Sequence, residues 1–159
     1  MSRSMTVGGF FLSLLVITAA CIAAEPAREP TYLSAAEVRN SVAHTRDGLA
    51  SSQVPTGVGG AVVLVVRRDA PGEVEVHDAL NDVFVVHEGQ ATVLVGGRVA
   101  GHRQTAPGEW RGGKITGAKS YHLAVGDILW IPAGIPHQVV VAKDGSFTYL
   151  AFKSPRSPG

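Results

Sequence analysis

Short alternating and β-branched segments dominate the chain from residue 61 onward. Residues 73–77 alternate charged and apolar side chains with a period of two, which is the pattern of a half-buried β-strand. Further strand-like runs, most of them bounded by Gly or Pro, lie at residues 61–67, 82–86, 90–95, 121–125, 128–131, 137–141 and 147–152. About eight short strands with frequent turns predict an all-β fold, either an antiparallel sandwich or a barrel.

The segments outside these runs are predicted to form one helix and several loops. Ser34 and Glu37 have the spacing of a capping box, which predicts a short helix over residues 35–44. Residues 47–60 and 101–117 are rich in glycine and lack a clean periodicity, so we expect both to be loops. The expected organisation is a signal peptide (1–24), a tether with a short helix and loop (25–60), a barrel (61–153) and a mobile tail (154–159).

The N-terminus has the three parts of an export signal. Arg3 is its one charged residue, an apolar run covers residues 7–17, and small residues are concentrated at 19–24. We expect cleavage before Glu25, which gives a periplasmic or extracellular protein with no transmembrane span after processing. A retained membrane anchor is the alternative, although a full span needs about 20 apolar residues. The residues before Cys21 also resemble a bacterial lipobox, which would leave a lipidated Cys21 as the membrane anchor.

Charge and composition narrow the classes of partner. The chain has 14 Lys and Arg residues against 13 Asp and Glu residues, and Arg3 lies in the predicted signal peptide, so the remainder has a net charge of zero. A neutral body offers no electrostatic surface for nucleic acid or anionic lipid. Apolar residues make up 45% and charged residues 17% of the chain, which favours a folded domain over disorder. The partner that we expect is a small molecule.

Candidate chemistry is concentrated on a few histidines and carboxylates. Glu75 and His77 are two positions apart in a predicted strand, so both side chains point to the same sheet face. Asp82 opens the next strand, and His137 opens another strand after a proline-rich turn. Two histidines with one carboxylate are a common ligand set for a catalytic divalent metal with open positions. In the ordinary alternative, these histidines lie at the surface or in the core and bind nothing.

A segment that begins at Gly126 resembles the second conserved motif of the cupin superfamily. That motif reads Gly, five residues, Pro-x-Gly, two residues, His and, four positions further on, Asn. Gly126, Pro132, Gly134 and His137 match it, whereas Val141 stands in place of the Asn. One supporting contact of the family is therefore in question for this chain.

An upstream segment resembles the first cupin motif, which reads His-x-His, three or four residues, Glu, six residues and Gly. Glu75, His77, Asp82 and Gly89 have this spacing. Two of the ligand positions differ, because Glu75 replaces the first His and Asp82 replaces the Glu. The two motifs together cover about residues 61–152, which is nearly the whole predicted folded body.

The resemblance implies a jelly-roll barrel that holds a divalent metal through His77, Asp82 and His137, with Glu75 as a candidate fourth ligand. If the shorter Asp82 does not reach, then Glu75, His77 and His137 bind the metal and Asp82 supports them. This set contains more hard oxygen ligands than the three His and one Glu usual in the family. It therefore favours Fe, Mn or Ni over copper, and Zn is a further candidate. A cupin that has lost its metal is the alternative.

The four candidate ligands are expected to face one barrel interior with few other polar groups. Two buried carboxylates would repel each other there, and one would have to stay protonated. A bound metal removes this penalty because it favours ionised carboxylates and neutral imidazoles.

The family resemblance also bounds the function. Dioxygenation, isomerisation and β-elimination are all known for cupins, so it implies a metal-dependent enzyme that acts on a small polar molecule, an oxidoreductase first and an isomerase or lyase next. The alternatives are a non-catalytic cupin that binds a small ligand or a metal, and a structural domain with a dead site.

The predicted loop at residues 101–117 contains candidates for a lid or a substrate contact, which are Trp110, Arg111 and His102. A flexible hairpin with an exposed Trp is the other interpretation of that loop.

Strand alternation also predicts an apolar outer surface. Val74, Val76, Val83 and Val85 are expected to point away from the candidate ligands. A soluble monomer rarely leaves such a patch bare. The pattern therefore predicts a homodimer, unless the N-terminal helix covers these side chains.

Overall fold

The computed structural model describes residues 30–55 and 62–156. The predicted signal peptide, Cys21, part of the first predicted loop (56–61) and the last three residues (157–159) lie outside the described residues. The described ranges contain the helix α1 (Ala35–Ser41) and thirteen strands, and no helix in them is long and apolar enough to cross a membrane. The strands are β1 (Leu49–Val54), β2 (Val62–Arg68), β3 (Glu75–His77), β4 (Leu80–Gly89), β5 (Ala91–Val95), β6 (Arg98–Ala100), β7 (Arg103–Ala106), β8 (Glu109–Arg111), β9 (Lys114–Thr116), β10 (Lys119–Leu123), β11 (Ile128–Ile131), β12 (His137–Val140) and β13 (Phe147–Pro155).

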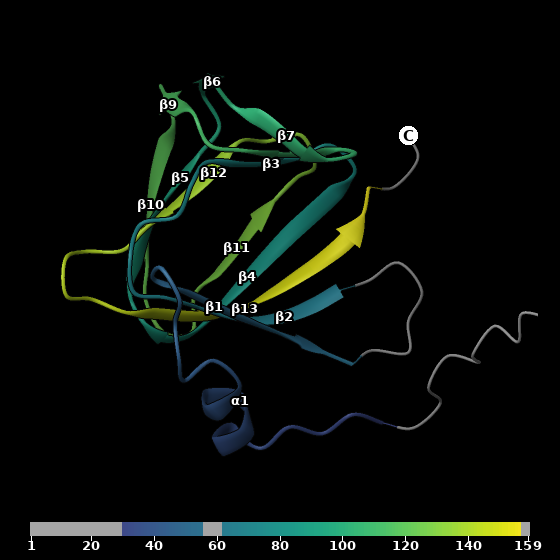
Figure 1. Cartoon of the computed structure of the whole chain (residues 1–159), viewed down its shortest axis with the longest axis vertical. Helices are drawn as coiled ribbons and strands as arrows, with labels where there is room; N and C mark the ends of the chain where they lie inside the picture. Colours follow the sequence, from purple (N-terminus) through teal and green to yellow (C-terminus); the bar gives the residue numbers. More distant parts are fainter. Residues whose placement is uncertain (1–29, 56–61, 157–159) are drawn as a thin grey trace, which may run out of the picture.

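Two sheets face each other and enclose the barrel (Figure 1). The five-stranded sheet has the order β1-β2-β13-β4-β11, and the six-stranded sheet has the order β10-β5-β12-β3-β8-β7. Strands β6 and β9 form a separate two-stranded ribbon. Neighbouring strands such as β13 and β4, or β12 and β5, are antiparallel and far apart in the sequence, as in a jelly roll. The predicted fold class, an antiparallel jelly-roll barrel with a short N-terminal helix, is confirmed.

The core fills the space between the two sheets. Alternate side chains of β4 point inward, so Phe84 and Val86 are buried in the same row as Asp82. A polar cluster can therefore lie at the end of the barrel where β4 begins, next to an apolar core. The buried core residues are Val66, Phe84, Val86, Ala91, Val93, Leu123, Leu129, Ile131, Val139, Val141, Phe147, Tyr149 and Ala151.

The helix α1 begins as predicted and ends earlier. The Ser34 hydroxyl accepts a hydrogen bond from the Glu37 amide, and the Glu37 carboxylate accepts one from the Ser34 amide, which confirms the capping box. The helix was expected to reach residue 44, but it ends at Ser41. At this end the Val42 amide bonds to the Arg39 carbonyl three residues earlier, a tightened turn that closes many helices.

The segment after α1 covers part of the outer face of the five-stranded sheet. Val65 points away from the core, yet it is buried, and Val42 is buried as well. A hollow lined by Val42, Arg67 and Thr148 indicates that this segment rests on the sheet. Figure 1 shows α1 outside the barrel, beyond the five-stranded sheet.

Two segments that were predicted to be loops contain strands. Strand β1 lies in the first of them and pairs with β2 along its whole length. It was missed because its residues are mostly small and polar, so backbone hydrogen bonds rather than an apolar pattern define it. The second segment contains β7, β8 and β9, which are short and separated by glycines. The predicted mobile tail is also partly wrong, because β13 continues to Pro155.

Candidate metal centre

Strand register brings the four predicted ligands together. Glu75 and His137 are directly opposite each other across the β3–β12 pair. His77 lies on the same face of β3 as Glu75 and is 2% exposed. Asp82 faces these strands from β4 in the opposite sheet and is 1% exposed. The ligand atoms of Glu75, His77 and His137 all lie within 4.8 Å of one another.

The turn of the second motif is tied to the strands that carry the other ligands. The Gly134 amide donates to the His77 carbonyl at 2.7 Å, and the Ala133 amide donates to Asn81 Oδ1 at 3.0 Å. Gly134 has a φ of 80°, which glycine adopts at little cost. The turn before His137 therefore has a fixed position relative to His77.

His77 is surrounded by carboxylates. Its Nδ1 lies 2.6 Å from Glu109 Oε2, and its Nε2 lies 3.1 Å from Asp82 Oδ2 and 3.6 Å from Glu75 Oε2. Burial alone would lower the pKa of His77, but the contacts with Asp82 and Glu75 outweigh it and raise the pKa to about 9. The imidazole therefore holds a proton at neutral pH, which a metal ion would have to displace.

His137 has one nitrogen bound and the other free. Its Nδ1 lies 3.2 Å from the Ile135 carbonyl oxygen, so we assign the proton to Nδ1 and a lone pair to Nε2. Burial lowers the pKa of His137 below its ordinary value, which keeps the ring neutral. The Nε2 atom is buried and has no hydrogen-bond partner among the described residues.

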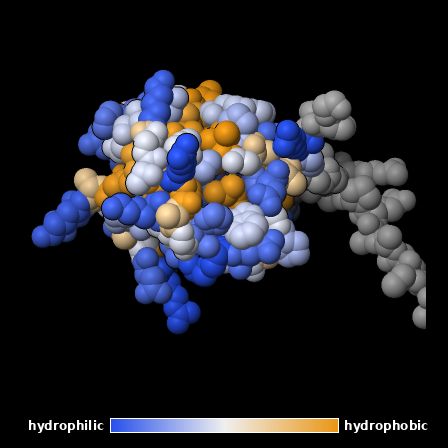
Figure 2. Space-filling view, turned by 90° about the horizontal axis from the view of Figure 1, so that it is seen from above, coloured by the Kyte–Doolittle hydropathy of each residue, from blue (hydrophilic) through white to orange (hydrophobic). Residues whose placement is uncertain are grey.

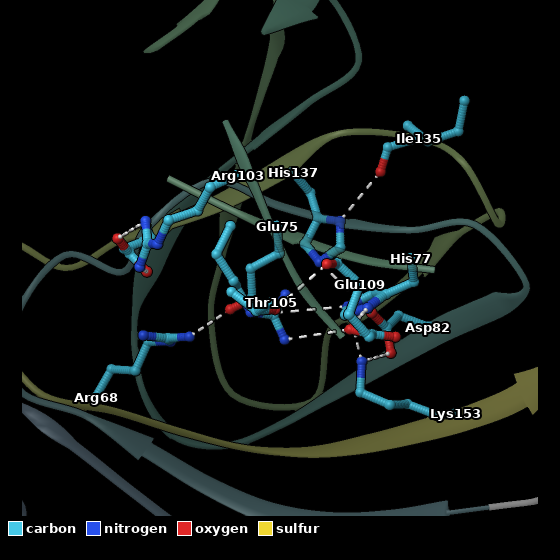
Figure 3. A network of polar contacts seen from close by, with 12 residues as sticks. Arg68, Glu75, His77, Asp82, Arg103, Thr105, Glu109, Ile135, His137 and Lys153 are labelled. Atoms are coloured by element: carbon cyan, nitrogen blue, oxygen red, sulfur yellow. Dashed lines mark hydrogen bonds and ion pairs between the residues drawn. The ribbon is translucent and has the colours of Figure 1, made fainter. Parts of the chain in front are cut away.

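Lys153 supplies a cation at the centre of the cluster. Its Nζ donates to Asp82 Oδ1 at 2.7 Å and lies 2.9 Å from His77 Nε2 (Figure 3). Burial alone would raise the pKa of Asp82, but His77 and Lys153 lower it below its ordinary value. The other oxygen, Oδ2, lies 3.5 Å from His137 Nε2 and has no hydrogen-bond partner in the described part of the chain.

Glu75 is held by two arginines. Its Oε1 accepts a hydrogen bond from Arg68 at 2.7 Å, and its Oε2 lies 2.9 Å from Arg111 Nη1. Burial alone would raise the pKa of Glu75, but His77, Arg111, His137 and Arg68 together hold it well below its ordinary value. Glu75 is therefore ionised without a metal ion.

The expected barrel interior with few other polar groups is wrong. Sequence reasoning missed Arg68, Glu109 and Lys153, and strand register explains two of them. Glu109 is opposite His77 across the β3–β8 pair, and Lys153 is opposite Asp82 across the β4–β13 pair. Directly opposite residues point to the same face of a sheet, so each acquires a partner of opposite or complementary charge.

Alternation within the strands gave a usable signal for two of these residues. Lys153 is two positions beyond Ala151 and four beyond Tyr149, and both of those side chains are buried. Arg68 is two positions beyond the core residue Val66. Continuing each inward row by one step predicts a buried cation in both strands. Glu109 offered no comparable signal, because its strand is three residues long.

Of the three loop residues proposed for a lid, one lies at the cavity and two lie away from it. Arg111 lines the cavity beside Glu75. Trp110 precedes it in β8, and its Nε1 donates to Asp78 Oδ2 at 3.0 Å. The His102 ring packs edge-on against Trp110 with centroids 5.1 Å apart. The structure therefore brings Arg111 to the site and places Trp110 and His102 outside the cavity wall.

A cavity of about 170 Å³ adjoins the cluster. Its polar walls come from both sheets, and its apolar walls come from the five-stranded sheet. It is lined by Leu49, Ser51, Leu64, Val66, Arg68, Glu75, Phe84, Arg111, Tyr149, Ala151 and Lys153.

The donor set fits a divalent metal ion. His137 Nε2 and Asp82 Oδ2 are buried without hydrogen-bond partners in the described ranges, and they face each other at 3.5 Å. Unpaired buried polar atoms are destabilising, and a metal ion satisfies both a neutral imidazole and a carboxylate. Glu109 fixes the His77 ring from behind, as carboxylates do for metal-bound histidines. The Lys153 ammonium is the group that the ion would have to displace.

Comparisons with known proteins agree with the fold. No family model and no curated protein matches the sequence. Among solved structures, an uncharacterised protein with a double-stranded β-helix domain from Klebsiella pneumoniae subsp. pneumoniae MGH 78578 has a TM-score of 0.58 at 20% identity, covering 82% of this chain and 95% of that chain. KdgF from Halomonas sp. has a TM-score of 0.51 at 18% identity, covering 72% and 86%.

A third similar structure is the DMSP lyase DddQ from Ruegeria pomeroyi DSS-3, with a TM-score of 0.50 at 18% identity. The match covers 78% of this chain and 51% of DddQ, so the chain spans about half the length of that protein. The sheets and these likenesses define a double-stranded β-helix barrel. The chain therefore has the barrel fold that its resemblance to the cupin motifs implied.

Proposed function

We propose that this chain is a divalent-metal-dependent cupin enzyme that acts on a small polar molecule. The observation that carries the proposal is the convergence of Glu75, His77 and His137, whose ligand atoms lie within 4.8 Å of one another. Asp82 Oδ2 lies beside both histidines. Two imidazoles with carboxylates form a common ligand set for a catalytic divalent metal.

Each residue of the cluster has a role in this proposal. His77 and His137 hold the ion through Nε2, and Asp82 is the carboxylate ligand because its Oδ2 lies beside both histidines and has no hydrogen-bond partner among the described residues. Glu75, which two arginines already hold, is the weaker fourth ligand. When bound, the ion polarises an oxygen of the substrate or lowers the pKa of a bound water. Lys153 also lines the adjoining cavity, where its ammonium could donate a hydrogen bond to a bound substrate.

The reaction class is an oxidoreductase, isomerase or lyase type. The lyase assignment of DddQ is one of these, although a likeness at 18% identity concerns the fold.

We also propose that the chain is exported to the periplasm or the extracellular space. The basis is the succession of a charged residue, an apolar run and small residues before Glu25. N-terminal sequencing of the exported protein should start near residue 24 or 25, or at a lipidated Cys21. A protein that retains Met1 in the membrane fraction contradicts export by cleavage.

A non-catalytic cupin that binds a small ligand is the second candidate. The observation that favours it is Lys153, which compensates Asp82 without a metal ion. Arg68 and Arg111 compensate Glu75 in the same way. Both carboxylates therefore have cationic partners in the metal-free form.

Water relaxation of the manganese-loaded protein separates these candidates. Metal-free protein is titrated with Mn(II), and the relaxation of water protons is measured for the wild type and for His137→Ala. The enzyme proposal predicts one tight Mn(II) with an exchangeable water in the wild type and none in the variant. A protein that takes up no Mn(II) but co-purifies with an organic ligand contradicts the enzyme and supports the binding module.

A further inference from the structure

The cavity beside the metal centre is walled by cations on its polar side. Arg68, Arg111 and Lys153 line it, and Glu75 is the one carboxylate in its wall. Arg68 is buried and reaches the cavity from β2, whereas Arg111 reaches it from β8 in the opposite sheet. Fixed cations in a cleft focus a positive potential, because the surrounding protein screens charge less than water does.

Arg111 has donor capacity that the protein leaves unused. Its Nη1 is buried and lies 2.9 Å from Glu75 Oε2, but it makes no hydrogen bond to any described residue. Its Nη2 lies 3.5 Å from Glu109 Oε2, at the limit of a useful contact. A guanidinium has five N–H donors in a planar fork that matches a carboxylate. A planar anion in the cavity would satisfy the buried Nη1.

The charge balance changes when a metal ion binds. Glu75, Asp82 and Glu109 offset the charges of Arg68, Arg111 and Lys153, so the proton on His77 leaves the cluster with a net positive charge. A divalent ion that displaces this proton adds one further positive charge to the buried cluster. An anionic ligand in the adjoining cavity offsets part of that charge, so binding of the ion and of the anion should favour each other.

The size and the other walls of the cavity restrict the anion. At roughly 30 Å³ per water molecule, a cavity of 170 Å³ holds about five or six waters or a molecule of similar size. Leu64, Val66, Phe84 and Ala151 form an apolar wall on the five-stranded sheet, which also carries Arg68, and Arg111 comes from the opposite sheet. This wall suits a short hydrocarbon chain better than a fully hydrated inorganic ion.

We infer that this cavity binds a small carboxylate, with the carboxylate group on Arg111 and Arg68 and the carbon chain against the apolar wall. The inference names the substrate class of the proposed function, and it rests on that function only for placing the reacting end of the ligand at the metal centre. The cavity and its arginines exist without the ion, so carboxylate binding can be measured on metal-free protein.

Calorimetric titration of metal-free protein with propionate tests the inference. Propionate is small enough for the cavity, and propionamide is its neutral counterpart of the same shape. We expect propionate to bind at least tenfold more tightly than propionamide, and Arg111→Gln to weaken propionate binding at least tenfold. Arg103→Gln is the matched control, because Arg103 is exposed, pairs with Glu73 and does not line the cavity.

Three results would overturn the inference. Equal binding of propionate and propionamide would show that charge is not recognised. Unchanged binding by Arg111→Gln, with the variant folded in a thermal melt, would show that this arginine is not the anchor. Displacement of propionate by an equal or lower concentration of inorganic phosphate would assign the cavity to phosphate. Failure of the proposed function would instead appear as a wild type that takes up no metal, and it would leave these titrations unchanged.

Discussion

Lys153 makes the centre a site in which a side-chain ammonium and a metal ion compete for the same carboxylate. It donates to Asp82 Oδ1 at 2.7 Å and lies 2.9 Å from His77 Nε2. Lys153→Met removes the competing charge and keeps most of the apolar stem. We expect metal affinity to rise at least tenfold, which corresponds to about 1.4 kcal/mol, in a competition titration against a chromophoric chelator.

The same variant should lower the stability of the metal-free protein, because it leaves Asp82 buried without its cation. The effect of adding metal on the melting temperature should therefore be larger in Lys153→Met than in the wild type. Equal metal affinities in the two proteins would mean that Lys153 does not occupy the position of the ion.

The two carboxylates should respond differently to neutral substitution. We expect Asp82→Asn to weaken metal binding by more than 100-fold, because it removes the negative charge of the carboxylate whose Oδ2 has no hydrogen-bond partner among the described residues. Glu75→Gln should weaken binding by about 10–100-fold, the range for a residue that supports a ligand. Metal titrations of both variants, with thermal melts of the metal-free forms as controls, measure this order. A larger loss in Glu75→Gln would make Glu75 the principal carboxylate ligand.

At the residue scale, the sequence predicted the candidate ligands and missed their partners. His77, Asp82 and His137 follow from motif spacing, which is local information. Lys153 and Glu109 become neighbours of these residues only through the register of strands that are distant in the sequence. No local pattern contains that register, although the inward row of β13 marks Lys153 as facing the barrel interior.

At the scale of elements, the turn before β12 positions His137 relative to β3. Gly134 has a φ of 80°, and no heavy atom lies within 4 Å of the position that a Cβ would take. Gly134→Ala therefore introduces backbone strain without a clash, at a cost of about 1–2 kcal/mol. We expect the strain to shift the turn and to lengthen the hydrogen bond from the Gly134 amide to the His77 carbonyl. The affinity for the metal should fall at least fivefold.

Gly117→Ala is the matched control for this prediction. Gly117 has a φ of 69°, with equally open space around it, in the turn between β9 and β10. Both variants should lose similar stability in chemical denaturation, and only Gly134→Ala should lose metal affinity. Equal metal affinities in the two variants would show that the turn does not position His137.

Strands in which apolar and polar residues alternate were predictable, and strands defined by backbone pairing alone were not. Strand β4 has a clean alternation and was predicted from it. Strand β1, with its small polar residues, is held by pairing with β2. The short strands β7 to β9 lie among glycines that are also typical of loops, so the sequence could not distinguish the two.

At the scale of the whole molecule, the outer face of the five-stranded sheet has an apolar patch near its β11 edge. Ile128, Trp130 and Phe152 are 69%, 56% and 39% exposed, and the register places Trp130 and Phe152 on either side of Val83. Val74 is buried, so it does not contribute to an exposed apolar patch. Figure 2 views the molecule from above the orientation of Figure 1, and on that face projecting hydrophilic side chains divide the hydrophobic surface.

We expect this patch, defined by Ile128, Trp130, Val83 and Phe152, to bind a second copy of the chain. Strand β11 is an edge strand, so a partner can cover the patch and pair with the edge. Light scattering should give a dimer mass at micromolar concentration for the wild type and a monomer mass for Trp130→Asp. Tyr32→Asp changes an exposed aromatic residue outside the patch and should remain dimeric. A monomeric wild type would refute the dimer.

The central claim is that the barrel holds a divalent metal through His77 and His137, and metal content tests it most directly. Elemental mass spectrometry of the purified protein should give about one divalent ion per chain for the wild type. His77→Ala and His137→Ala should contain almost none and still unfold cooperatively. A chelator should lower the wild-type melting temperature by about 5 °C or more, as expected for loss of a tight ligand. A wild type that contains no metal, takes up none and melts identically with and without chelator would contradict the account.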